Sequence, residues 1–450
     1  MPASFRWRLL LLALVALAVR IAWVRLEPET GPVADESMWL TWGAQVLPSQ
    51  KVGFSPLRLS FIFHPPLYVY LVGAASELLG GFSSVRYVQA VLGATLALSL
   101  GLIGRRLSGE ATGLVAAALA ALYPELVWFV SHYWAETAFT VLLWWGMERL
   151  IAADADRSWH AALLAGGLFG LAVLTRETVL YFVPLAGLWL AFRRTGGRCR
   201  AALFVGTAAL VVLPWTVRNW LVFDAFVPVS TAGALNLWQG NARLSRQEVY
   251  DQYRLVHGRI AQYENARRRG LEAVLQRQPW WILEKLRDEL PEYFAVHGQP
   301  IVHLERGAYG EVPRARAFAA IAVVLLPYLA LLGLFVAGVA YLPGGRIPFL
   351  LLGFLVFYVL LHVATHGYPR YRLPSLPALF LVGAHGWVAW RSRPRPALRH
   401  RLAAALTAAV LALSIAPSLV AWASRPWPPP WSASAEAGDA GPAPAPDEGR

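Results

Sequence analysis

Two adjacent carboxylates follow the first long apolar segment of the chain. Asp35 and Glu36 lie beyond the run 9–25, which is long enough to cross a bilayer. A carboxylate in this position can accept the proton of an attacking hydroxyl group, and we interpret the pair as candidate catalytic residues. The alternative is structural, because Asp35 or Glu36 would also favour the start of a helix over 37–46.

Further ionisable side chains lie near the ends of later apolar segments, where a charge is costly unless it faces a cavity or a partner. They are His64, Glu136, Arg176, His366, Arg370 and Arg372. If they share one side of a membrane, the cations can hold a phosphate leaving group while a carboxylate accepts a proton. Structural ion pairs are the alternative for any single pair, such as Arg176 with Glu177.

The composition indicates a membrane protein. Of the 450 residues, 57% are hydrophobic and 15% charged, and the mean hydropathy is +0.46. The net charge of +13 does not point to nucleic acid as a partner, because the arginines fall in short clusters between apolar runs, as in cytoplasmic loops. Cys199 is the single cysteine, which excludes an intrachain disulfide and a cysteine-based metal cluster. The basic start Phe5-Arg6-Trp7-Arg8 is typical of an uncleaved signal anchor.

The apolar runs predict an all-α polytopic membrane protein with about eleven transmembrane helices. These runs are 9–25, 86–104, 112–130, 134–152, 160–175, 178–192, 201–222, 317–342, 347–365, 373–390 and 402–422. The run 65–80 is short for a span, and we expect a juxtamembrane helix there. The short arginine clusters then all share one side, predicted to be cytoplasmic together with the N-terminus. They are Arg6 and Arg8, Arg105 and Arg106, Arg157, 193–200, Arg346 and 391–401.

This topology divides the chain into four parts. Residues 1–222 form an N-terminal transmembrane module with a first outer loop over 26–85, and 317–422 form the C-terminal transmembrane helices. Between them, 223–316 is expected to form a small helical domain outside, because 246–278 and 280–290 are polar with helical spacing of apolar residues. The segment 423–450 is rich in Pro and Ala, and we expect it to be disordered.

Several short motifs in a fixed order resemble the GT-C glycosyltransferases, in particular the group of protein O-mannosyltransferases and aminoarabinose transferases. They are Asp35-Glu36, His64-Pro65-Pro66-Leu67, the run Arg86 to Leu107, Thr175-Arg176-Glu177, Pro214 to Asn219, and Arg370-Tyr371-Arg372-Leu373-Pro374. The resemblance covers about residues 5–395. Each motif alone is weak, and their order carries the signal.

The resemblance implies an inverting glycosyltransferase of the bacterial inner membrane, with its site facing the periplasm or exterior. The donor would be a hexose or pentose on a polyprenyl phosphate, and the acceptor a glycan, lipid or protein. Asp35 would act as the base beside Glu36, and Glu136 would be a second acid. His64 stands where relatives often have lysine, and His366, Arg370 and Arg372 would hold the lipid phosphate, with Arg372 preferred over His366.

A divalent metal is a further candidate, since oligosaccharyltransferase relatives use one whereas the mannosyltransferase branch works without. The spacing of the acids and histidines fits no compact metal site, and cationic side chains suffice for the leaving charge, so we expect no obligatory metal or cofactor. The rival function is a transporter or lipid flippase, although such proteins usually show internal repeats and midplane binding residues. A non-catalytic assembly protein with the same fold is the third alternative.

Overall fold

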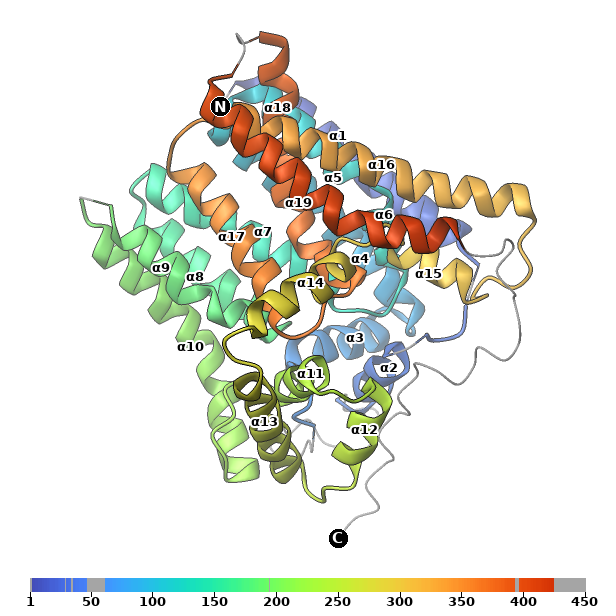
Figure 1. The fold of residues 1–450 in the computed structure, drawn as a ribbon. Helices are drawn as coiled ribbons and strands as arrows, with labels where there is room; N and C mark the ends of the chain where they lie inside the picture. The colour runs from blue at the N-terminus through green and yellow to red at the C-terminus, as the bar shows by residue number, and fades with distance from the viewer. Residues whose placement is uncertain are drawn as a thin grey trace.

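The computed structural model describes residues 2–28, 30–33, 35–46, 61–193, 195–392 and 396–424, and every regular element within these ranges is a helix (Figure 1). The predicted all-α fold is therefore confirmed. Residues 425–450, where we expect disorder, lie outside the described residues. The helices of the first half of the chain are α1 (Ala3–Leu26), α2 (Glu36–Gln45), α3 (Pro66–Leu79), α4 (Ser83–Ser108), α5 (Glu110–Leu122), α6 (Pro124–Trp128), η3 (Phe129–Ser131), α7 (Glu136–Ala155), α8 (Trp159–Val173), η4 (Glu177–Tyr181), α9 (Val183–Ala191) and α10 (Gly197–Phe223).

The second half of the chain begins with shorter helices and ends with long apolar ones. These helices are α11 (Ala232–Asn241), α12 (Arg246–Arg254), α13 (Arg259–Gln276), α14 (Trp281–Tyr293), α15 (Gln299–Glu305), α16 (Arg314–Tyr341), α17 (Arg346–Ala364), η5 (Pro369–Ser375), α18 (Leu376–Ser392) and α19 (Leu398–Ala423). The predicted helical character of 223–316 is thus observed. The helical pattern that begins at Val249 is interrupted after α12 at Gly258, whose φ of 90° suits glycine.

Seven helices among the described residues are long and apolar enough to cross a membrane, or eight if the bent pair α5 and α6 counts as one span. The prediction of eleven spans is therefore not confirmed. The other predicted spans are also helical, but they are too short or too charged to cross a membrane. Helix α7 carries several charged residues, α8 has 15 residues, and η4 with α9 covers only 177–191. Helix α3, predicted to be juxtamembrane, has 14 residues and is likewise too short to cross.

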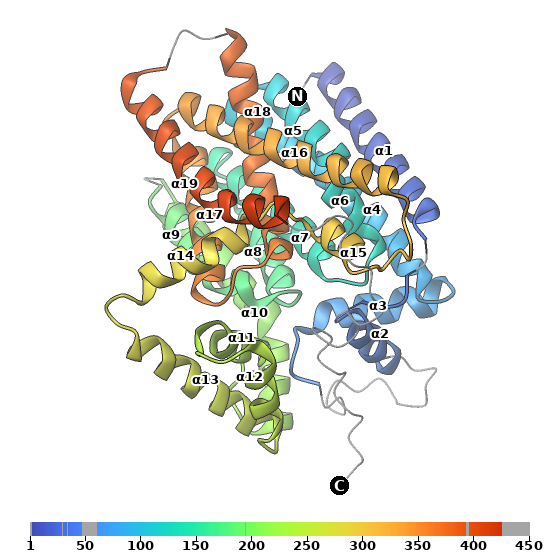
Figure 2. The same ribbon diagram turned by 45° about the vertical axis from the view of Figure 1, so that its right-hand side comes forward.

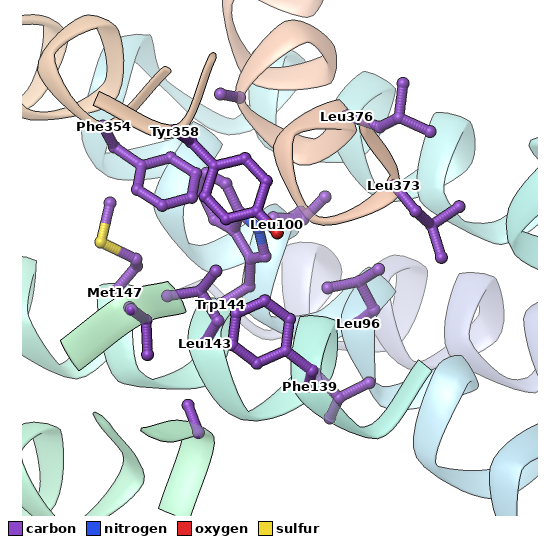
Figure 3. Close-up of a cluster of buried hydrophobic side chains, with 14 of the residues drawn as sticks. Leu96, Leu100, Phe139, Leu143, Trp144, Met147, Phe354, Tyr358, Leu373 and Leu376 are labelled. Atoms are coloured by element: carbon purple, nitrogen blue, oxygen red, sulfur yellow. The ribbon is translucent and has the colours of Figure 1, made fainter. Parts of the chain in front are cut away.

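Close helix contacts and buried aromatic groups hold the bundle together. A Cβ atom on Gly104 of α4 would meet the Cα atom of Gly113 of α5 at 2.9 Å, so only glycine lets these backbones approach this closely. Figure 3 shows the central cluster, in which Trp144 of α7 lies beside Phe354 and Tyr358 of α17. The Trp144 Nε1–H donates to the Pro374 carbonyl at 2.9 Å, which satisfies the indole donor and fixes η5 against the core.

Ion pairs connect the turns at one end of the bundle. Arg106 contacts Asp156 at 2.6 Å, and Asp154 pairs with both Arg193 and Arg346, at 3.6 and 3.0 Å. Four of the arginine clusters predicted to be cytoplasmic therefore lie near one another. The N-terminal cluster adjoins them, because the Arg105 guanidinium lies 5.6 Å from the centre of the Phe5 ring.

The opposite end holds helices from the two segments that we predicted to lie outside the membrane. In Figures 1 and 2, helices α2 and α3 lie beside α11, α12 and α13, on the side of the molecule away from the N-terminus. We call α11 to α13 the cap. Its own small core contains Leu235, Trp238, Val249 and Tyr253, and Ser245 begins α12 with a capping box to Glu248. The cap therefore faces α2 and α3 across the end of the bundle.

Candidate active site

A cavity of about 590 Å³ lies between the cap, α2 and the ends of several bundle helices. Six of the predicted site residues line it: Asp35, His64, Glu136, Arg176, His366 and Arg370. Asp35 comes from the start of α2 and Arg370 from η5, so residues 335 positions apart in the sequence meet in this cavity. Glu36 and Arg372 are not among the lining residues.

The cavity wall contains a row of alternating acids and arginines. Arg370 donates two hydrogen bonds to Asp35, with Nη1 to Oδ1 at 2.8 Å and Nη2 to Oδ2 at 3.1 Å. Its Nε lies 3.1 Å from Oε1 of Glu136, and Arg176 Nη1 donates to the same oxygen at 2.5 Å. The two parallel hydrogen bonds from Arg370 fix the plane of the Asp35 carboxylate.

The Asp35 side chain lines the cavity and does not cap its own helix. Asp35 occupies the N-cap position of α2, yet its side chain makes no capping hydrogen bond. The side chain is 29% exposed, and a carboxylate has about four lone-pair positions, of which Arg370 occupies two. The interpretation of Asp35 as a helix cap therefore lacks the contact it needs, and lone pairs remain for a ligand in the cavity.

Electrostatics keep Asp35 ionised. Burial raises the pKa of Asp35, but the charge of Arg370 and its hydrogen bonds lower it by more, so that the net pKa lies below its usual value. The carboxylate is therefore available as a proton acceptor at neutral pH.

His64 carries no permanent charge, unlike the lysine that the resemblance leads us to expect at its position. Burial lowers the pKa of His64 to about 4, although the Asp35 carboxylate opposes the shift. The ring lies against Trp39 and Phe63, with centroids 4.8 and 4.7 Å apart. At neutral pH it is a neutral side chain that lines the cavity near Asp35 and cannot attract a phosphate by charge.

Glu36 points into the protein interior. Its Oε1 accepts from the Tyr133 amide at 2.8 Å and lies 3.0 Å from Nδ1 of His132, and its Oε2 accepts from the Val33 amide at 2.8 Å. On its other side the His132 ring lies 3.3 Å from Glu27. The prediction that places Glu36 beside Asp35 as a second catalytic carboxylate is therefore not supported by this geometry. Glu36 joins the chain before α2 to the turn after η3.

Arg372 is also an interior residue. It is 2% exposed, and its guanidinium donates to the Ala295 carbonyl and, at 3.1 Å, to Glu125, and lies 4.0 Å from the centre of the Tyr328 ring. We predicted Arg372 to be a phosphate ligand together with Arg370, and the geometry places its guanidinium in the interior. In η5, residues 370 and 372 point in different directions, so the neighbouring arginines face a cavity and a buried acid respectively.

His366 lines the cavity in a neutral state. Burial lowers the pKa of His366 well below its usual value, and the charge of Arg246 contributes. Its ring packs edge-on against Tyr371 at 5.3 Å between centroids. The ring therefore offers shape and one hydrogen-bonding nitrogen rather than a positive charge.

The segment 223–316 supplies cavity residues that were not predicted. Arg246 and Tyr250 of α12, Arg259 at the start of α13, and Arg306 after α15 all line the cavity. The Ser245-x-x-Glu248 pattern predicts a helix that starts at Arg246. That signal gives the helix but not its orientation toward the bundle, which depends on how the cap packs.

The described residues contain no group of three or more His, Cys, Asp or Glu side chains that could hold a metal ion. Within the cavity, each carboxylate of the acid–arginine row has an arginine within hydrogen-bonding distance. This wall therefore consists of ion pairs, whereas Arg246 and Arg259 of the cap face the cavity from the other side.

Comparison with known proteins supports a family and a fold. Residues 63–220 match the model of the family "Dolichyl-phosphate-mannose-protein mannosyltransferase". The match includes His64, Glu136 and Arg176 and excludes Asp35 and Arg370. The comparison with curated protein sequences gives no significant match.

Two solved structures share the fold over nearly the whole chain. ArnT from Cupriavidus metallidurans, bound to undecaprenyl phosphate, is 16% identical with a TM-score of 0.52, over 93% of this chain and 65% of that chain. The Archaeoglobus fulgidus oligosaccharyltransferase in the apo form is 15% identical with a TM-score of 0.51, over 92% of this chain and 55% of that chain.

The chain thus spans less than two thirds of the length of either protein. At these identities the likeness concerns the fold, and it confirms the GT-C-like architecture predicted from the sequence. Over residues 63–220 the chain is therefore similar to the dolichyl-phosphate-mannose-protein mannosyltransferase family, and its polytopic helical fold is similar to those of ArnT and the archaeal oligosaccharyltransferase.

Proposed function

We propose that this protein is a membrane glycosyltransferase that moves a sugar from a polyprenyl-phosphate donor to an acceptor at the outer face of the inner membrane. The observation that carries the proposal is the Asp35 carboxylate, which is held by Arg370 and faces a cavity of about 590 Å³ lined by further arginines. The family match over 63–220 supports the class of donor. The acceptor would be a glycan, a lipid or a protein.

The reaction is an inverting displacement at the anomeric carbon. The acceptor oxygen or nitrogen forms a bond to this carbon as its proton passes to Asp35, and the bond from the carbon to the phosphate oxygen breaks. The electron pair leaves with the polyprenyl phosphate, whose negative charge is stabilised by cations. We assign this charge stabilisation to Arg246 and Arg259 of the cap, with Arg176 of the acid–arginine row as a third cation that lines the cavity. Since these cations supply the charge, the proposal needs no metal ion.

The direct test uses the full chain in nanodiscs with polyprenyl-phosphate donors that carry labelled hexoses or pentoses. We expect labelled sugar to be released from at least one donor when envelope extracts supply acceptors. Mass spectrometry of envelope glycans and lipids from a deletion strain should show one missing sugar, which names the donor and acceptor together. Movement of the donor across the bilayer without any sugar transfer would instead indicate a flippase.

The assignment of donor phosphate to the cap predicts a change in donor affinity. Arg246→Ala should raise the donor KM by about tenfold with a smaller change in kcat, because a charge-assisted hydrogen bond is worth roughly 1.5–3 kcal/mol. Initial rates over a range of donor concentrations measure this. Arg267→Ala is the matched control, since Arg267 is an exposed arginine of the cap that does not line the cavity. Equal KM values for the Arg246 variant and the wild type would contradict the assignment.

The proposed orientation places the arginine-linked end of the bundle in the cytoplasm and the cap outside. This follows from the bias of short cytoplasmic loops toward arginine and lysine, from which long loops such as 223–316 are largely exempt. Alkaline phosphatase fused after Gln262 should be active, and a fusion after Arg198 inactive. The reverse pattern at either position would overturn the orientation.

A further inference from the structure

A buried lysine joins three elements beside the cavity. Lysine occurs only at positions 51 and 285, in a chain with 40 lysines and arginines in total. Lys285 lies on α14 and is 1% exposed. Almost all other cations of this chain are arginines, so a buried lysine at this position needs a specific explanation.

The three protons of its ammonium group have three acceptors. Nζ donates to the Gly240 carbonyl at 2.7 Å, to the Thr365 carbonyl at 2.7 Å and to Oε1 of Glu289 at 2.8 Å. Gly240 is near the C-terminal end of α11, and Thr365 caps α17. Lys285 therefore lies at the negative ends of two helix dipoles and satisfies carbonyl groups that the helices leave unpaired. A planar guanidinium cannot direct three donors to this compact set of acceptors.

Glu289 extends the junction into the turn after α17. Its Oε2 accepts from the Gly367 amide at 2.6 Å. The backbones are close here, because a Cβ atom on Gly240 would lie 3.1 Å from the His366 nitrogen. Asn241 adds a hydrogen bond to the Ala364 carbonyl at 2.9 Å. The Trp281 Nε1–H of α14 also donates to Asn241 Oδ1 at 2.7 Å. Lys285 is the one of these α14 side chains that bonds both to the end of α11 and to residue 365.

The attached turn leads directly to the proposed site. His366, Tyr368 and Arg370 line the cavity, and Arg370 holds Asp35. The far end of this segment is fixed independently, by the hydrogen bond from Trp144 to Pro374. The near end is the part to which Lys285 bonds.

We propose that Lys285 is a positioning residue, which clamps the cap helix α11 and the 364–367 turn to α14 and thereby sets the place of Arg370 relative to Asp35. The catalytic consequence rests on the proposed function, whereas the clamp itself does not. Lys285 touches no reacting atom, and it acts through the turn.

The first test measures the clamp without any activity. Hydrogen exchange of the full chain in nanodiscs should be at least tenfold faster across 364–368 in Lys285→Met than in the wild type. Arg287→Met is the matched control, because Arg287 lies on the same helix, is exposed and pairs only with its neighbour Asp288 among the described residues. Unchanged exchange in Lys285→Met would overturn the proposal, whether or not the protein transfers sugar.

The second test uses the pH profile of transfer. The groups around Asp35 are Arg370, Glu136, Arg176 and His64, and of these Arg370 holds its pKa down most. If the clamp is released, Arg370 moves and the pKa of Asp35 rises, so activity is lost at a higher pH as the pH falls. We expect this acid limb to shift upward in Lys285→Met, with kcat about tenfold lower and the donor KM within about twofold.

A second variant covers the case in which Lys285→Met does not fold. Glu289→Gln keeps an acceptor for Lys285 but places its amide nitrogen, a donor, opposite the Gly367 amide, so it should show the same two changes to a smaller extent. Lys285→Arg should not restore wild-type behaviour. A wild-type acid limb in Glu289→Gln, or full activity of Lys285→Arg, would contradict the clamp. Absence of transfer by the wild type would instead refute the proposed function and leave the exchange result to decide on the clamp.

Discussion

Asp35→Asn should abolish sugar transfer while the protein stays inserted and folded. Asparagine has nearly the shape of aspartate but cannot accept the acceptor's proton, and the loss of a general base lowers rates by roughly 10²–10⁴-fold. The measurement is release of labelled sugar from polyprenyl phosphate by membranes or nanodiscs, together with a thermal unfolding curve in detergent.

This substitution separates the catalytic from the structural interpretation. Asparagine caps a helix as well as aspartate does, so a helix-capping residue would tolerate the change. The matched control is Asp288→Asn, which alters an exposed aspartate of α14 that is paired with an arginine. Near-normal turnover by Asp35→Asn would remove the reason for assigning catalysis to this residue.

Arg372→Met should strongly lower the free energy of unfolding. The fraction of the variant that still folds should have a donor KM close to that of the wild type. The change would leave Glu125 as an unpaired charge in a buried site, and removal of one partner from a buried ion pair costs roughly 3–5 kcal/mol. Thermal or denaturant unfolding in detergent measures the loss. This expectation differs from the prediction made from the sequence. If Arg372 held the lipid phosphate, its loss would raise the donor KM.

A double variant tests the cause of that loss. Replacement of both partners removes the unpaired charge, so Glu125→Gln with Arg372→Met should recover part of the stability. A stable single variant with a donor KM raised tenfold would show that Arg372 binds the phosphate after all.

The sequence correctly indicated which end of the bundle holds the candidate site, because charges near the ends of apolar runs need a cavity or a partner. Asp35, Arg370 and Glu136 were found in this way, and the structure brings them together. The same rule could not distinguish Asp35 from Glu36. That difference depends on the amides of Val33 and Tyr133, and the second of these lies 97 residues along the chain.

Span number and cap orientation escaped prediction for a different reason. The charged residues of α7 are visible in the sequence and argue against a span, whereas the ends of α8, which leave it only 15 residues long, are set by packing against its neighbours. The capping box before Arg246 predicts where α12 starts, whereas the apolar residues Leu235 and Tyr253 turn it toward the cavity through the core of the cap. Such long-range contacts have no local signal.

The pairing of Asp35 with Arg370 has a consequence for biosynthesis. The ribosome produces Asp35 early and Arg370 only 335 residues later, after five of the seven candidate spans among the described residues have been synthesised. A nascent or prematurely terminated chain therefore holds the carboxylate without its guanidinium partner. Every chain that ends before residue 370 should be inert toward the sugar donor, however well its first helices insert.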